Sequence, residues 1–116
     1  MTETQEQMDF VRWLNYHHPD VLFWHTPNGG KREISTAHKL SKMGVRRGVP
    51  DLFFPQLKLF IEMKSPKGSL SKDQKILKQQ LEKDYTYIVA KGFVDAVKSF
   101  SLFINDVENQ TNNQMI

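Results

Sequence analysis

The sequence predicts one α/β domain over residues 1–116, in which helices flank a mixed β-sheet. A chain of 116 residues can bury one core of modest size but is too short for two domains of ordinary size. Hydrophobic residues recur at helical spacing in some segments and form short strand-like runs in others. The segments follow one another as helix, strand, helix, strand, strand, helix, strand and helix, an order typical of helices that pack on a sheet.

The first part of the chain predicts a helix, a strand and a second helix. Apolar residues recur at helical spacing from Thr4 to about Tyr16, and Pro19 lies beyond the end. The β-forming run VLFWHT, residues 21–26, leads into PNGGKR, whose asparagine and glycines indicate a loop. STAHKLSKMG then has a Ser/Thr start, apolar residues three apart, and Gly44 as a C-terminal cap. We expect a short helix there.

Two apolar runs lie in the middle of the chain, within VPDLFFPQLKLFIEMK. Only PQLK separates them, so an antiparallel hairpin is the simplest connection, and it would form the centre of the sheet. Beyond a turn-rich segment, Ser71 and Gln74 have the spacing of a capping box. The helix that they open would bury Ile76, Leu77 and Leu81.

The last part of the chain predicts one more strand and one more helix. YTYIVA, residues 85–90, can lie parallel to the strand before it because a helix connects the two. GFVDAVKSFSLFIND has apolar residues at helical spacing. The tail from about Val107 is polar, and we expect it to fray.

The composition excludes several classes of function. The chain has no cysteine, which rules out disulfides, thiolate catalysis and cysteine-ligated zinc. No apolar run approaches the roughly 20 residues that span a bilayer, and the N-terminus lacks the residue order of a signal peptide. We therefore expect a soluble cytoplasmic protein with no membrane partner.

Charge is distributed unevenly along the chain. Residues 31–78 contain 12 Lys or Arg against four acidic residues, a local balance of +8, whereas the remaining residues contain four basic and nine acidic residues, or −5. Concentrated basic charge is typical of a protein that binds a polyanion, because neutralising phosphates releases counterions. A solvated lysine-rich surface is the other interpretation of the charge alone.

Three charged residues lie in or beside the most hydrophobic strand-like segments. Glu62 and Lys64 are two residues apart, so they share one face of an extended strand at a separation of about 6 to 7 Å. Asp51 starts the preceding strand, and a hairpin returns the chain so that Asp51 reaches the same end of the sheet. The alternative is that Glu62 and Lys64 form a surface ion pair while Asp51 caps a turn after Pro50.

Oxygen ligands with few other donors suit a hard cation such as Mg²⁺ or Mn²⁺. Asp51 and Glu62 would supply the carboxylates, and water and a backbone carbonyl, that of Met63, would complete the set. Such an ion polarises a phosphoryl oxygen and lowers the pKa of an attacking water, while a nearby lysine positions that water. The pattern therefore favours phosphodiester hydrolysis.

GVPDLFF, FIEMK and the glutamine of SKDQK resemble the PD-(D/E)XK nuclease superfamily. More narrowly, PNGGKR, KMGVRRGVPDL and IEMKSPKGSLSKDQ look like the virus-type replication-repair nuclease (VRR-Nuc) domain, and the match covers roughly residues 3–98. The resemblance implies a restriction-endonuclease-like core and a DNA endonuclease dependent on Mg²⁺ or Mn²⁺. It also implies that Asp51 and Glu62 hold the metal, Lys64 assists the attacking water, and Gln74 supports the site or a phosphate. An acidic residue of the first helix often joins the cluster in this superfamily, here Glu6 with Glu3 as its rival.

The resemblance is to the stand-alone form known from phages and bacteria, which is similar to Holliday-junction resolvases. It implies branched DNA as the substrate, a role in DNA repair, a homodimer, and a location in a bacterial cell or phage-infected host. Trp13 or Tyr16 on the first helix could serve a dimer interface. Of the four histidines, only His25 precedes the Asn-Gly-Gly loop, and it is the histidine that merits a test. The residues that we expect to contact DNA are Asn28, Gly29, Lys31, Arg32, Arg46, Arg47, Lys67 and Lys72.

Two other functions remain open at this point. A DNA-binding module with a degenerate nuclease core would bind DNA in a salt-dependent way without turnover. A sequence-specific restriction-type endonuclease would share the catalytic residues but cut at fixed sites.

Overall fold

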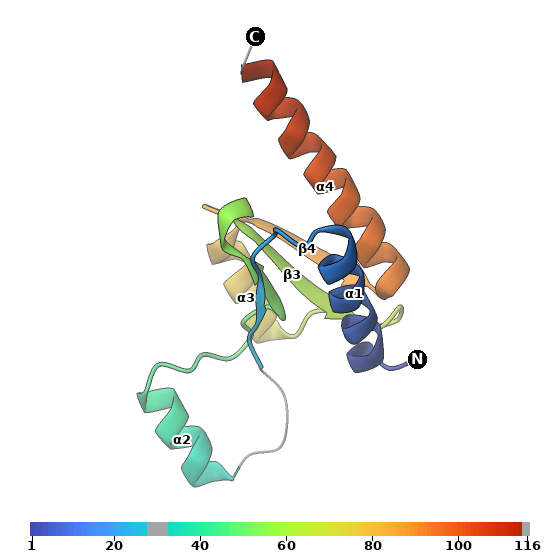
Figure 1. Cartoon of the computed structure of the whole chain (residues 1–116). Helices are drawn as coiled ribbons and strands as arrows, with labels where there is room; N and C mark the ends of the chain where they lie inside the picture. The colour runs from blue at the N-terminus through green and yellow to red at the C-terminus, as the bar shows by residue number, and fades with distance from the viewer. Residues whose placement is uncertain (28–32, 115–116) are drawn as a thin grey trace. The chain divides into compact units, whose positions relative to one another are not determined.

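A computed structural model describes residues 1–27 and 33–114, the last two of these by their backbone alone. Its elements are α1 (Glu3–His17), β1 (Trp24–His25), α2 (Ile34–Lys42), β2 (Leu52–Phe54), β3 (Leu59–Lys64), α3 (Lys72–Leu81), β4 (Thr86–Lys91) and α4 (Phe93–Gln114), as Figure 1 shows. A 3₁₀ turn, η1 (Pro55–Leu57), joins β2 to β3. The expected order of helices and strands is confirmed.

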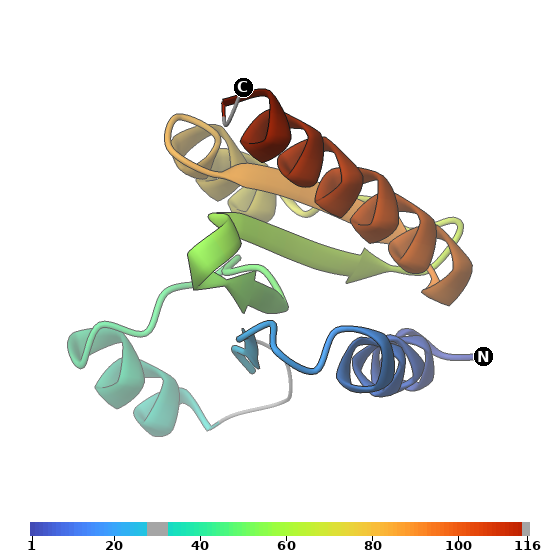
Figure 2. The same ribbon diagram turned by 45° about the horizontal axis from the view of Figure 1, so that its top comes forward.

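The four strands form one mixed sheet in the order β1-β2-β3-β4. β2 pairs antiparallel with both β1 and β3, and Phe53 faces Phe60 across the hairpin. β2 and β3 are thus the central strands, as expected, and Figure 2 shows the short helical connection between them. At the end of this connection Lys58 adopts a left-handed conformation with φ 50°, which lets the chain reverse direction.

The described chain divides into two compact units. The first contains residues 1–21, 63–68 and 88–114, and the second contains residues 22–27, 33–62 and 69–87. In the first unit α1 and α4 pack through aromatic side chains, with the Phe10 and Phe100 rings 6.2 Å apart and Trp13 also against Phe100. Phe10, Leu14, Ala96 and Phe100 are fully buried in this core. Tyr16 is 80% exposed.

The second unit holds the hairpin, β1, the start of β4, and helices α2 and α3. Leu52, Phe54, Leu59 and Ile61 are fully buried. On the opposite face of the strands Phe53 stacks on Phe60 at 4.4 Å, and the Tyr85 ring contacts both edge-on. Buried and partly exposed side chains alternate along β2 and the start of β3, whereas Ile61, Glu62 and Met63 are buried in succession.

Helix α2 stands apart from the strands of its own unit (Figure 1). It buries none of its residues, and Ile34 at its start and Met43 just beyond its end are 79% and 71% exposed. None of the helices among the described residues is long and apolar enough to cross a bilayer.

Three details of the elements differ from expectation. The strand predicted over residues 21–26 is reduced to Trp24–His25, because only these two residues pair with β2. Ile76 is 46% exposed, so the core face of α3 is narrower than the apolar pattern indicates. The tail does not fray at Val107: α4 continues to Gln114, and the Thr111 hydroxyl donates to the Val107 carbonyl at 3.0 Å within the helix.

Candidate active site

The site forms where the chain enters the central hairpin. Asp51 directly precedes β2, and Glu62 lies near the end of β3, so the antiparallel register brings the two positions together. The backbone N–H of Asp51 donates to Glu62 Oε1 at 3.2 Å. This contact shows that the hairpin places the two acidic residues side by side.

Glu62 is the only charged residue among the buried side chains of the described chain, with 4% of its surface exposed. Its second oxygen, Oε2, accepts a hydrogen bond from Gln74 Nε2 at 3.0 Å. A buried carboxylate is stable only where donors or cations satisfy it. The two donors described here fix the position and the orientation of the carboxylate.

Gln74 reaches Glu62 from the first turn of α3. The Ser71 side chain accepts from Gln74 N, and Gln74 Oε1 accepts from Ser71 N at 2.8 Å, so the predicted capping box is present. The amide oxygen of Gln74 therefore caps the helix while its amide nitrogen holds the carboxylate. Gln74 supports Glu62 in this structure.

Lys64 follows Glu62 by two residues on β3, so the two side chains leave the same face of the strand. Leu59, Ile61 and Met63 leave the opposite face, and all three are buried. The apolar side of β3 thus anchors the strand in the core, and Glu62 and Lys64 lie on its other side.

The backbone carbonyl of Asp51 is held by the strand next to β2. It accepts from the Thr26 N–H at 3.0 Å and lies 2.8 Å from His25 Nδ1. His25, the histidine that the sequence indicated, therefore contacts the backbone of a site residue. Because Nδ1 must carry the proton to donate to a carbonyl, this contact favours one tautomer of the ring.

Tyr87 was not indicated by the sequence beyond its place in a strand. It lies on β4, 8% exposed, and burial together with the negative charges of Glu62, Asp51 and Glu82 raises the pKa of its hydroxyl. Alternation along YTYIVA places Tyr85 and Tyr87 on one face, but that pattern does not distinguish a site residue from a core residue.

The other expected site residues are distributed as follows. Glu6 belongs to the first unit, where its Oε1 accepts from the Phe93 N–H at 3.1 Å at the start of α4. Glu3 is exposed in the first turn of α1.

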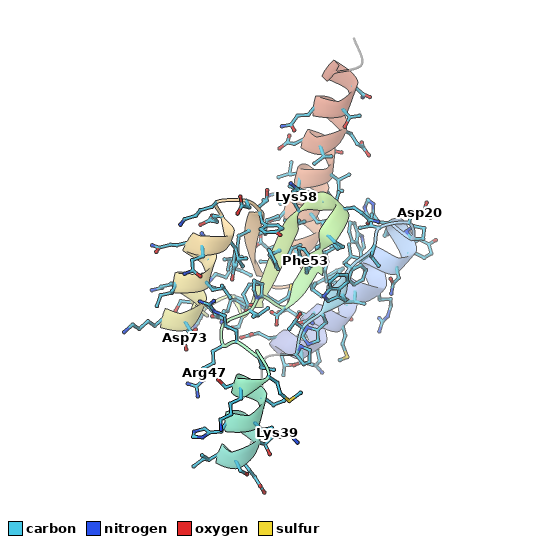
Figure 3. All side chains as sticks on the ribbon, turned by 90° about the vertical axis from the view of Figure 1, so that its left-hand side faces the viewer. Asp20, Lys39, Arg47, Phe53, Lys58 and Asp73 are labelled. Carbon is cyan, nitrogen blue, oxygen red and sulfur yellow. The ribbon has the colours of Figure 1, made fainter. Side chains whose placement is uncertain are left out.

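The basic residues expected to contact DNA are exposed where the structure describes them, namely Arg46, Arg47, Lys67 and Lys72. Arg46 donates to Gln80 Oε1 at 3.2 Å. Figure 3 labels Arg47 between α2 and β2, and Asp73 in the first turn of α3. Asn28, Gly29, Lys31 and Arg32 lie outside the described residues.

The donor set fits a hard divalent cation. Asp51 and Glu62 offer carboxylate oxygens, and the oxygen ligands preferred by Mg²⁺ and Mn²⁺ include backbone carbonyls and water. Within residues 1–27 and 33–114 no group of three or more histidine, cysteine or acidic side chains is close enough to hold a metal ion. A metal here would therefore depend on two carboxylates, with a carbonyl and water as further ligands.

The family model that matches this sequence is that of the VRR-NUC domain, over residues 1–94. The chain belongs to the VRR-NUC family. This is a nuclease-type family, and the Asp51, Glu62 and Gln74 cluster of the VRR-NUC chain lies within the matched range.

A solved structure described as a VRR_NUC domain protein is similar to this VRR-NUC chain, with a TM-score of 0.76 and 24% sequence identity. The similarity covers 90% of this chain and 89% of the other. It confirms the α/β fold. A search of curated proteins found no match.

Proposed function

We propose that this chain is a divalent-metal-dependent endodeoxyribonuclease that hydrolyses phosphodiester bonds in branched DNA, such as Holliday junctions, as a homodimer in DNA repair. The observation that carries the proposal is the buried Glu62 carboxylate, held by Asp51 N–H and Gln74 at the end of a hairpin in a VRR-NUC chain. Buried carboxylates beside an acidic neighbour are costly for a fold, and a bound cation gives them a role.

Each residue has a distinct part in this proposal. Asp51 and Glu62, with the Met63 carbonyl, would hold Mg²⁺ or Mn²⁺, and Gln74 would keep the Glu62 carboxylate in place. When bound, the ion would supply charge stabilisation to the phosphoryl oxygen and acidify a coordinated water. Lys64 holds the attacking water and offsets negative charge that develops on the phosphate. Glu6 remains a candidate for the same cluster, with Glu3 as its rival.

The basic residues position the nucleic acid. Arg46, Arg47, Lys67 and Lys72 are exposed cations that contact backbone phosphates in this proposal. The proposal assigns phosphate contact to Asn28, Gly29, Lys31 and Arg32 as well, which precede these residues in the sequence. Phosphate contacts bind without reading sequence, which agrees with selection by DNA structure and not by base order.

The test is cleavage of labelled four-way junction, flap, linear duplex and single-stranded DNA with Mg²⁺, with Mn²⁺ and with a chelator. We expect cutting of the branched substrates only with metal. Asp51→Asn and Lys64→Ala should each lower the rate at least about a hundredfold, since removal of one charge-stabilising group typically has that effect. Asp84→Asn, at an exposed carboxylate, is the matched control and should cut like the wild type.

Each of the following outcomes would contradict part of the proposal. Salt-dependent DNA binding without turnover under any metal would indicate a binding module. Discrete fragments from plasmid DNA would indicate a sequence-specific enzyme. A monomer in light scattering at working concentrations, with and without junction DNA, would contradict the homodimer.

A further inference from the structure

Tyr87 carries a buried polar atom that the proposed reaction does not yet use. Among the described residues, its hydroxyl oxygen is the buried side-chain atom that lacks any hydrogen-bond partner. Burying a hydroxyl without a partner destabilises a fold, and a phenylalanine at the same position would avoid that cost. The presence of a tyrosine hydroxyl at this position therefore needs an explanation.

The Tyr87 side chain belongs to the strand next to the one that carries Glu62, because β4 neighbours β3 in the sheet. Lys78 of α3 places its Nζ 5.6 Å from the centre of the Tyr87 ring, which packs the ring against that helix. Burial, followed by the charges of Glu62 and Asp51, raises the pKa of the Tyr87 hydroxyl, in agreement with a position near these two carboxylates.

The cluster already supplies donors to Glu62 from within the protein. Glu62 Oε1 accepts from Asp51 N, and Oε2 accepts from Gln74 Nε2. The Tyr87 O–H is thus a further donor near two carboxylates, with no described protein atom as its acceptor. A neutral donor suits an oxygen atom of a group bound at the two carboxylates.

We propose that Tyr87 is a ligand-contacting residue of the Asp51 and Glu62 site, donating its O–H to an oxygen atom of the bound group. That oxygen belongs either to a water on the divalent ion or to a DNA phosphate. The inference rests on the proposed function for its choice of ligand, but its test does not depend on cleavage.

The test compares Tyr87→Phe with the wild type and with Tyr85→Phe. Tyr85 is a matched control because it lies two residues before Tyr87, next to the start of β4, and its ring packs on Phe53 and Phe60. Three quantities are measured: the melting temperature without metal, Mn²⁺ affinity by calorimetry, and four-way junction affinity in a chelator. We expect Tyr87→Phe to raise the melting temperature by about 4 °C or more.

The same substitution should weaken one of the two affinities about tenfold, because it removes a hydrogen bond to a charged or metal-bound oxygen. Weaker Mn²⁺ binding would identify the acceptor as a metal-bound water, and weaker junction binding in the chelator would identify a phosphate. Tyr85→Phe should change neither affinity.

Two results would overturn the inference. A more stable Tyr87→Phe that binds both Mn²⁺ and the junction like the wild type would show that the hydroxyl serves no ligand. A less stable variant would show that the hydroxyl has a partner within the protein. A wild-type chain that binds both probes but cuts no DNA would contradict the nuclease proposal alone, whereas one that binds neither would contradict both.

Discussion

At the scale of single residues, Gln74 joins the helix cap to the acidic cluster. Its amide oxygen accepts from Ser71 N and its amide nitrogen donates to Glu62 Oε2. A glutamate at this position would cap the helix equally well, since the capping box accepts either residue. Only an amide, however, can cap the helix and also donate to a carboxylate. The choice of glutamine is therefore explained by Glu62.

Substitutions at Gln74 and Ser71 separate the two roles. Gln74→Glu keeps the cap acceptor but places a second carboxylate against Glu62, so we expect cleavage to fall at least about tenfold with little loss of helix stability. Ser71→Ala removes the cap and should lower the free energy of unfolding by about 1 kcal/mol while cleavage is retained. Urea unfolding measures the stability of each variant, and junction cleavage measures its activity. Equal cleavage by Gln74→Glu and wild type would show that the amide does not orient Glu62.

At the scale of elements, Gly48 controls how the segment before β2 approaches α3. Its φ is +85°, and a Cβ added there would lie 2.8 Å from the backbone carbon of Asp73 and 3.0 Å from Gln74 N. Backbone atoms cannot move aside as a flexible side chain can. Only glycine permits both this conformation and this close approach, which brings the first turn of α3 next to Asp51.

Gly44 is a matched control for Gly48. Its φ is +101°, but an added Cβ would meet nothing within 4 Å. Gly44→Ala should therefore lower the free energy of unfolding by about 1 kcal/mol from backbone strain alone. Gly48→Ala adds a backbone clash to the same strain, so we expect a decrease of about 2 kcal/mol or more. Similar decreases for the two variants in urea unfolding would contradict the proposed close approach.

Some elements are determined by local signals in the sequence, and others depend on contacts with distant residues. The hairpin and the Ser71 capping box were predictable because short-range chemistry determines them. The length of β1 was not, because it depends on which residues find partners on β2. The end of α4 was also missed, since polar composition favours fraying but does not prevent hydrogen bonds within the helix.

At the scale of the whole molecule, the distribution of charge is the feature that bears on DNA. The +8 balance over residues 31–78 covers α2, the hairpin and most of α3. Arg47 is exposed in the segment between α2 and β2 (Figure 3). The proposal therefore assigns this stretch of the chain, and not its acidic remainder, to phosphate contact.

Salt dependence of DNA binding tests this assignment. For each phosphate that a variant no longer neutralises, the slope of log affinity against log salt should fall in magnitude by about 0.9. We expect this change for Arg47→Gln and no change for Lys98→Gln, an exposed lysine of α4 outside the basic stretch. Binding is measured with the junction in a chelator at several salt concentrations. Equal slopes for all three proteins would remove Arg47 from the interface.

The candidate site was predictable in part for the same physical reasons as the fold. Asp51 and Glu62 stand out because acidic residues next to apolar strands are costly, and a hairpin brings them together. Tyr87 was not predictable, because a tyrosine in a strand is ordinary and the missing partner of its hydroxyl appears only in three dimensions. The double role of Gln74 required the distance to Glu62 as well as the capping pattern.

The fixed orientation of the Gln74 side chain also makes it a spectroscopic probe. Because its oxygen faces Ser71 N and its nitrogen faces Glu62, the amide cannot flip without breaking both hydrogen bonds. Its two amide protons are distinct in any case because rotation about the amide C–N bond is slow, and here one of them is held by a carboxylate. Their nuclear magnetic resonance signals would report a charge arriving at Glu62 without any label being added to the site.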